Sequence, residues 1–132
     1  MFGCMGDPFD IEIEPEVRLW LMNLSDADFE RAEHAAGRLS DDAATLGEPH
    51  SRYLGDGVRE LRFDLGHDRE AVRLSYWLAS GRRAVLLTVF RKTKQREEAE
   101  VARAKRAKVI CEAEHGPAHE EFTRTIKERD NR

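Results

Sequence analysis

Three consecutive segments in the middle of the chain have the residue pattern of β-strands, and they restrict the possible folds more than any other feature. In 59–65, apolar residues occupy one face and charged residues the other, and 71–78 alternates in a similar way. The third segment, 84–90, is almost wholly apolar, which is typical of a central strand covered on both faces. Turns at 66–68 and 79–81 join the segments. We therefore predict three hairpin-linked antiparallel strands.

The flanking sequence predicts one more strand and three helices. Residues 9–13 alternate apolar and acidic side chains, as a half-buried strand does. Pro15 suits the first position of a short helix, and Ser25 suits the N-cap of a second helix with one apolar face that Gly47 ends. Residues 97–114 predict a third helix, whose acidic start and later basic residues match the helix dipole. We interpret the segment from Gly47 to the first of the three central strands as a connector.

Together these elements predict an α+β fold of order β-α-α-β-β-β-α, a small sandwich with a mostly antiparallel sheet and helices packed on it. The first strand must join the sheet to bury its apolar side. A chain of 132 residues can form one compact core and is too short for two ordinary domains. We expect a single domain over 1–132 with its core at about 9–112. Residues 117–132 are expected to form an extra helix or a loose tail.

Charge is unevenly distributed along the chain, although the formal net charge is only −4. Residues 1–57 contain 4 basic and 13 acidic side chains, whereas residues 58–110 contain 14 basic and 7 acidic ones. This segregation predicts a local basic patch suited to an extended polyanion. The alternative is a charged surface that is merely solvated.

Several other kinds of protein and site are not expected. The chain has no apolar run of the roughly 20 residues that span a bilayer and no secretory signal, so we expect no membrane association. Cys4 and Cys111 are too few for a disulfide framework, which favours a reduced, cytoplasmic protein. His115 and His119 are four residues apart beside glutamates, but the Gly-Pro pair between them prevents one continuous helical face. We therefore expect no metal site.

Four short motifs occur in an order that resembles a known superfamily. They are Val58–Arg62 (VRELR), Val72–Tyr76 (VRLSY), Phe90–Lys94 (FRKTK) and Glu100–Ala104 (EVARA). With the order of elements, they resemble the RelE/ParE toxin superfamily, and within it the HigB-like branch of type II toxin–antitoxin systems. The resemblance covers roughly residues 9–112.

This resemblance implies a ribosome-dependent mRNA endonuclease that needs no metal or other cofactor. A helix-turn-helix antitoxin would neutralise it, and the pair would reach operator DNA only through that antitoxin. In such an enzyme the 2′-hydroxyl attacks the adjacent phosphorus while a base accepts its proton and cationic side chains stabilise the transition state. Guanidinium groups suit this role because their fork matches two phosphate oxygens.

The resemblance also assigns candidate site residues. Arg62 and Arg73 would share the polar side of adjacent strands, where they could converge on one phosphate, whereas Arg59 falls on the other side of a regular strand. Each arginine could instead be a solvated or ion-paired sheet residue, because Glu60 and Asp64 are close in sequence. The candidate catalytic residues are Arg73, Lys92 and Arg62, and the candidate phosphate-binding residues are Arg59, Lys94, Arg96 and Arg91.

The chain departs from the family pattern in its proton-transfer residues. No tyrosine or histidine lies between Thr93 and Glu114, Tyr76 is expected in the core, and His67 in a turn is the one candidate base. Together with an acidic pI of about 5.8, this leaves open a non-catalytic RelE/ParE-like module that binds a protein such as DNA gyrase or only its antitoxin. A phage-derived fold without activity is a third alternative.

Overall fold

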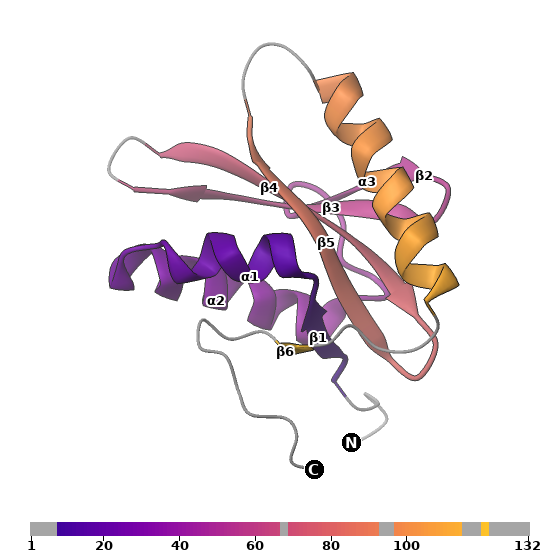
Figure 1. Cartoon of the computed structure of the whole chain (residues 1–132). Helices are drawn as coiled ribbons and strands as arrows, with labels where there is room; N and C mark the ends of the chain where they lie inside the picture. Colours follow the sequence, from indigo (N-terminus) through magenta and orange to yellow (C-terminus); the bar gives the residue numbers. More distant parts are fainter. Residues whose placement is uncertain (1–7, 67–68, 93–96, 115–119, 122–132) are drawn as a thin grey trace.

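The computed structural model describes residues 8–66, 69–92, 97–114 and 120–121, and it is the α+β fold predicted (Figure 1). The elements in chain order are β1 (Asp10–Ile13), α1 (Pro15–Met22), α2 (Asp26–Asp42), β2 (Ser51–Gly55), β3 (Val58–Leu65), β4 (Glu70–Ala79), β5 (Arg83–Arg91), α3 (Glu97–Ala113) and β6 (Glu120–Glu121). Among the described residues, no helix combines the length and apolar character that a membrane crossing requires.

The strands form one sheet in the order β2-β3-β4-β5-β1-β6. The three central strands are antiparallel neighbours, as predicted. β1 also joins the sheet, as expected, and runs parallel to β5 from the pair Asp10 and Arg83 to the pair Ile13 and Leu86. Helices α1 and α2 pack on one face of the sheet and α3 on the other (Figure 1).

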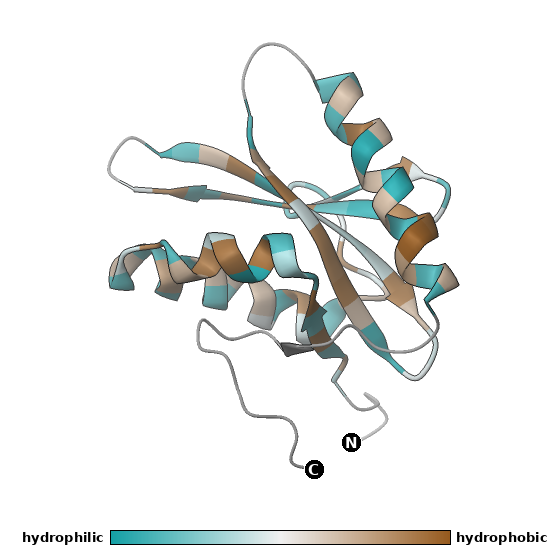
Figure 2. Cartoon of the chain, viewed as in Figure 1, coloured by the Kyte–Doolittle hydropathy of each residue, from teal (hydrophilic) through white to brown (hydrophobic). Residues whose placement is uncertain are grey.

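Strand β5 separates two apolar clusters and is buried on both faces, which confirms the prediction of a central strand. Ala84 and Leu86 belong to the larger cluster, which α1 and α2 cover. Val85 and Leu87 belong to a smaller cluster with Cys111 of α3. Figure 2 shows the apolar residues of β5 between the two helical layers. The alternation of faces along a strand therefore gives each helical layer its own core.

A β-bulge in β5 adjusts which side chains face which layer. Ser75 pairs with Thr88, whereas the next residue, Tyr76, pairs with Leu86, so Leu87 is the extra residue. The side chains of Leu87 and Thr88 consequently both lie on the α3 side of the sheet. There the Thr88 hydroxyl lies 2.5 Å from that of Ser75. Tyr76 is fully buried in the larger cluster, and its hydroxyl lies 2.6 Å from that of Ser51. The expectation that Tyr76 is a core residue is confirmed.

The helix starts follow local sequence signals. Pro15 occupies the start of α1, and the Ser25 hydroxyl caps α2 by accepting a hydrogen bond from the Asp28 amide at 3.1 Å. The apolar face of α2 buries three alanines and Leu39 against the sheet. The α-helix ends at Asp42, and turns lead on towards Gly47.

Two segments differ from the prediction. The segment predicted as a connector contains the edge strand β2, whose short sequence Ser51–Gly55 lacks a clean apolar alternation. It pairs with β3 from Ser51 opposite Leu61 towards the glycine-rich turn. In the tail, Glu120 and Glu121 pair with β1 as a two-residue strand and not as a helix. The rest of 117–132 lies outside the described residues.

The packing of α2 on the sheet can be tested by truncating its central side chain. Leu39 is 0% exposed, so we expect Leu39→Ala to lower the free energy of unfolding by roughly 2–5 kcal/mol through lost burial and a cavity. In Leu19→Ala, which removes a side chain that is 55% exposed, the change should stay within about 0.5 kcal/mol. Urea unfolding followed by circular dichroism gives both values. Equal effects would contradict the placement of the core.

Candidate phosphate-binding site

Two of the three predicted catalytic residues lie side by side on the face of the sheet that carries α3. Arg62 of β3 and Arg73 of β4 are directly opposite each other in the strand register. Both approach the carboxylate of Glu60, with each Nε 3.7 Å from Oε2. The shared face that strand alternation predicted for the two arginines is thus confirmed.

This cluster is buried, and burial sets its electrostatics. Glu60 is 4% exposed and Arg73 is 7% exposed. Burial raises the pKa of Glu60, while the charges of Arg73, Arg62 and Arg52 act to lower it. Burial also lowers the pKa of Arg73, as does the like charge of Arg62, and Glu60 opposes both effects. Because two guanidinium groups face one carboxylate, the cluster keeps an excess of positive charge that an anion can neutralise.

Lys92 lies at the end of the same face. It is two residues beyond Phe90, which pairs with Arg73, and its amide bonds to the Ala71 carbonyl at 2.8 Å. Its ammonium lies 2.7 Å from Glu97 at the start of α3. The hydrogen bond from Lys92 lowers the pKa of Glu97, and the charges of Arg73 and Arg52 contribute. The start of α3 is therefore within electrostatic reach of the cluster.

The end of β5 that leads to Lys92 is fixed by a pair of side chains. Pairing with β1 stops at Leu86. Further along, the Val89 amide donates to Glu16 at 3.0 Å, and the Val89 carbonyl accepts from Arg103 at 3.2 Å. Glu16 and Arg103 are joined at 2.6 Å, and this contact raises the pKa of Arg103. Side chains from α1 and α3 thus replace the backbone of a neighbouring strand.

Sequence reasoning missed three residues that lie near the arginine pair. Arg52 lies opposite Glu60, but its strand β2 had been interpreted as a connector. Arg38 of α2 and His50 lie near the arginine pair because the chain folds back over it, which no local pattern reveals. Arg38 and His50, together with Arg62 and Arg73, line a cavity of about 410 Å³, whose other lining residues are Pro49, Phe63 and Asp64.

Glu60 is the proton-transfer candidate that the sequence lacked. Glu60 and Arg62 are two residues apart in β3, which places both side chains on one face of the strand. The sequence pattern alone indicated only an ion-pair partner for the arginines. A carboxylate with a raised pKa beside two guanidinium groups can accept a proton from a hydroxyl held against them. The earlier candidate base, His67, lies outside the described residues.

The remaining predicted binding residues are not gathered at this cluster. Arg59 lies on the opposite face, as its strand position indicated, with its guanidinium 5.3 Å from the centre of the Tyr53 ring. Arg91 is exposed and pairs with Glu70 at 3.3 Å. Lys94 and Arg96 lie outside the described residues.

The described residues contain no group of three histidine, cysteine, aspartate or glutamate side chains placed to hold a metal ion. His115 and His119 fall outside those residues. Cys111 is buried, its Sγ lies 3.6 Å from Glu14, and burial raises the pKa of its thiol. Such a thiol is suited to packing and not to nucleophilic chemistry. Cys4 also falls outside the described residues.

Fold and site together define a class: a small α+β protein with a cavity lined by several arginines. The family is identified by comparison. Residues 19–109 match the family described as phage-derived protein Gp49-like (DUF891), and the chain belongs to this family, which is linked to RelE-like toxins of type II toxin–antitoxin systems. No curated protein matches the chain.

The electrostatics of Glu60 can be measured without any activity. We expect its carboxyl carbon to titrate in NMR spectra with a midpoint above 4.5, the ordinary value, because burial raises the pKa. Folding is then favoured by this group at low pH, and that contribution is lost as the pH rises through the raised pKa. Arg62→Gln should move the midpoint higher still, since the Arg62 charge lowers the pKa of Glu60.

Two control variants complete this titration. Glu60→Gln identifies the signal, and Arg83→Gln, which removes a guanidinium paired with Glu12, should leave the Glu60 midpoint unchanged. A midpoint at or below 4.5 in the unmodified protein would show that Glu60 is not buried between the arginines.

Proposed function

We propose that this protein is the toxin of a type II toxin–antitoxin system, of the HigB-like branch, and that it cleaves mRNA on the ribosome without a metal or other cofactor. The observation that carries the proposal is the pair of Arg62 and Arg73, which both contact the buried Glu60 and line a cavity large enough for a phosphate group. Membership of the Gp49-like family supports an antitoxin partner. We further propose a single-domain, cytoplasmic protein whose helix-turn-helix antitoxin contacts the operator DNA.

The geometry supports a division of roles. Arg62 and Arg73 bind the non-bridging oxygens of the scissile phosphate and stabilise the charge of the transition state. At 3.7 Å their contacts with Glu60 are ion pairs and not hydrogen bonds, so their N–H groups are not all committed to it. Glu60 takes the proton of the 2′-hydroxyl as its oxygen attacks phosphorus.

The second half of the reaction concerns the leaving group. As the bond from phosphorus to the 5′-oxygen breaks, Lys92 donates a proton to that oxygen, which gives a 2′,3′-cyclic phosphate and a 5′-hydroxyl. Lys92 is positioned for this by Glu97 at 2.7 Å and by its place beyond Phe90 on the Arg73 side.

Expression in a bacterial host without the antitoxin tests this function. We expect growth arrest and cleavage of translated mRNA, and we expect Arg73→Ala and Lys92→Ala to lower the cleavage rate by at least about 100-fold, because each removes a charge that stabilises the transition state. Arg83→Ala, an equal change at the other end of β5, should keep full toxicity. Primer extension on a reporter transcript measures cleavage, and intact transcripts in arrested cells would refute the nuclease.

A second candidate function is a non-catalytic module that acts by binding a protein, either DNA gyrase or only its antitoxin. The nearly complete burial of Arg73 against Glu60 favours it, because a structural ion pair has the same appearance. Purified protein added to translating ribosomes and, separately, to a gyrase supercoiling reaction distinguishes the two. Loss of supercoiling with intact mRNA would establish the binding module.

A further inference from the structure

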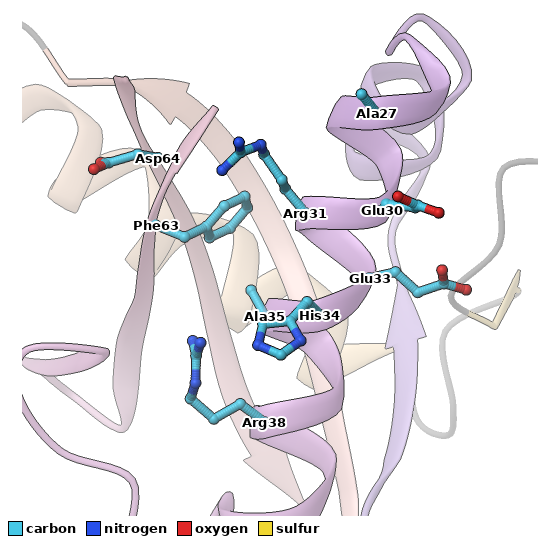
Figure 3. A pocket seen from close by; sticks show the side chains of 9 residues that line it. All are labelled: Ala27, Glu30, Arg31, Glu33, His34, Ala35, Arg38, Phe63 and Asp64. Atoms are coloured by element: carbon cyan, nitrogen blue, oxygen red, sulfur yellow. The ribbon is translucent and has the colours of Figure 1, made fainter. Parts of the chain in front are cut away.

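A groove runs from the arginine cluster along the outer edge of β3. Pairing with β2 ends at Leu61, and the Arg62 amide then bonds to the His50 carbonyl at 2.8 Å. Among the described residues, no strand lies beside Phe63 and Asp64 on that side. α2 lies there instead and encloses a second cavity of about 710 Å³ with them (Figure 3). The two cavities share Arg38, Phe63 and Asp64, so they lie next to each other.

The charges along this groove are sorted by direction. Figure 3 shows the side chains of Arg31 and Arg38 leaving α2 towards the strand that carries Phe63, whereas Glu30 and Glu33 point the other way. Glu30, Glu33 and Asp64 also line this cavity, so it carries charges of both signs, with the two arginines turned towards the strand. A negatively charged, extended ligand would meet Arg31 and Arg38 on the strand side of the cavity, away from the two glutamates.

The aromatic ring of Phe63 lies between the side chains of Arg31 and Arg38 (Figure 3). Phe63 is only partly buried, and it lines both cavities. Trp20 packs edge-on against this ring, with the ring centroids 6.4 Å apart and an angle of 61° between the ring planes. A supported, partly exposed ring between cationic side chains is the arrangement that binds single-stranded nucleic acid, since a base stacks on the ring while the backbone meets the cations.

We propose that this groove binds the RNA nucleotides that flank the scissile phosphate, with Arg38 on a neighbouring phosphate and Phe63 beneath a base. The inference rests on the proposed function, because the groove begins at the cluster of Arg62 and Arg73. It assigns α2 a role in substrate binding, and it explains why basic side chains of an otherwise acidic segment point to the sheet edge.

The test uses uncleavable RNA, 2′-O-methylated throughout, in a series from a dinucleotide to a hexanucleotide, with binding followed by fluorescence anisotropy. The longer oligomers should bind the full-length protein more tightly than the dinucleotide. Arg38→Gln and Phe63→Leu should each weaken hexanucleotide binding about ten-fold or more and leave dinucleotide binding nearly unchanged. Arg83→Gln is the matched control for a lost positive charge, and it should bind like the unmodified protein.

The salt dependence of RNA binding distinguishes the phosphate contact of Arg38 from the base stacking of Phe63. Loss of one phosphate contact should reduce the slope of log K against log salt concentration by about 0.7 in Arg38→Gln. Phe63→Leu should weaken binding with an unchanged slope, because stacking releases no counterions. Arg38 is a surface residue, so this variant is expected to fold even if Phe63→Leu does not.

The outcomes distinguish failure of this inference from failure of the proposed function. Length-dependent binding that Arg38→Gln abolishes, with unmodified RNA left intact, supports the groove and refutes the nuclease. If the protein cleaves unmodified RNA but Arg38→Gln changes neither the hexanucleotide affinity nor the salt slope, the proposal that the groove binds RNA is wrong. If Arg38→Gln instead weakens only the complex with the antitoxin, the groove is a protein-binding site and the RNA inference is wrong.

Discussion

The buried contact of Glu60 with Arg73 is the interaction on which the proposed activity depends. Removing two charges from water is costly, and mutual attraction offsets that cost only when the partners are held close. Here the strand register holds them, since β3 and β4 pair continuously from Val58 to Leu65. Arg62 adds a second positive charge to the same carboxylate. Two positive charges around one carboxylate support the proposal that the cluster attracts an anion.

The sheet divides the molecule into two unequal layers, and this division creates room for the site. The larger core, beneath α1 and α2, is made of apolar side chains and Tyr76, whose buried hydroxyl meets that of Ser51. On the other face, α3 contributes mainly small side chains such as Ala104 and Cys111. The polar cluster occupies part of the face that α3 shares, and the pair formed by Glu16 and Arg103 fastens the beginning of α3 to β5. The larger apolar core thus lies on one face and the proposed catalytic cluster on the other.

The same geometry explains why the groove beside β3 lies next to the cluster. β2 is short, so β3 extends beyond it and turns its last residues towards α2. Exposed strand edges favour unwanted pairing unless they are covered or charged. In this protein α2 covers the edge and Asp64 adds a charge to it. The proposed binding surface can therefore occupy this edge without disturbing the core.

The sequence by itself determined the strands of the central hairpins, the three helices, the helix start at Ser25 and the shared face of Arg62 and Arg73. These follow from local periodicity and from hydrogen bonds within a few residues, which a linear pattern records. Only the tertiary structure decided that β1 pairs in parallel with β5, that the segment before β3 forms an edge strand, and that Arg38, His50 and Arg52 approach the cluster. Those contacts join segments distant in sequence, and the role of Glu60 depends on a burial that only such contacts produce.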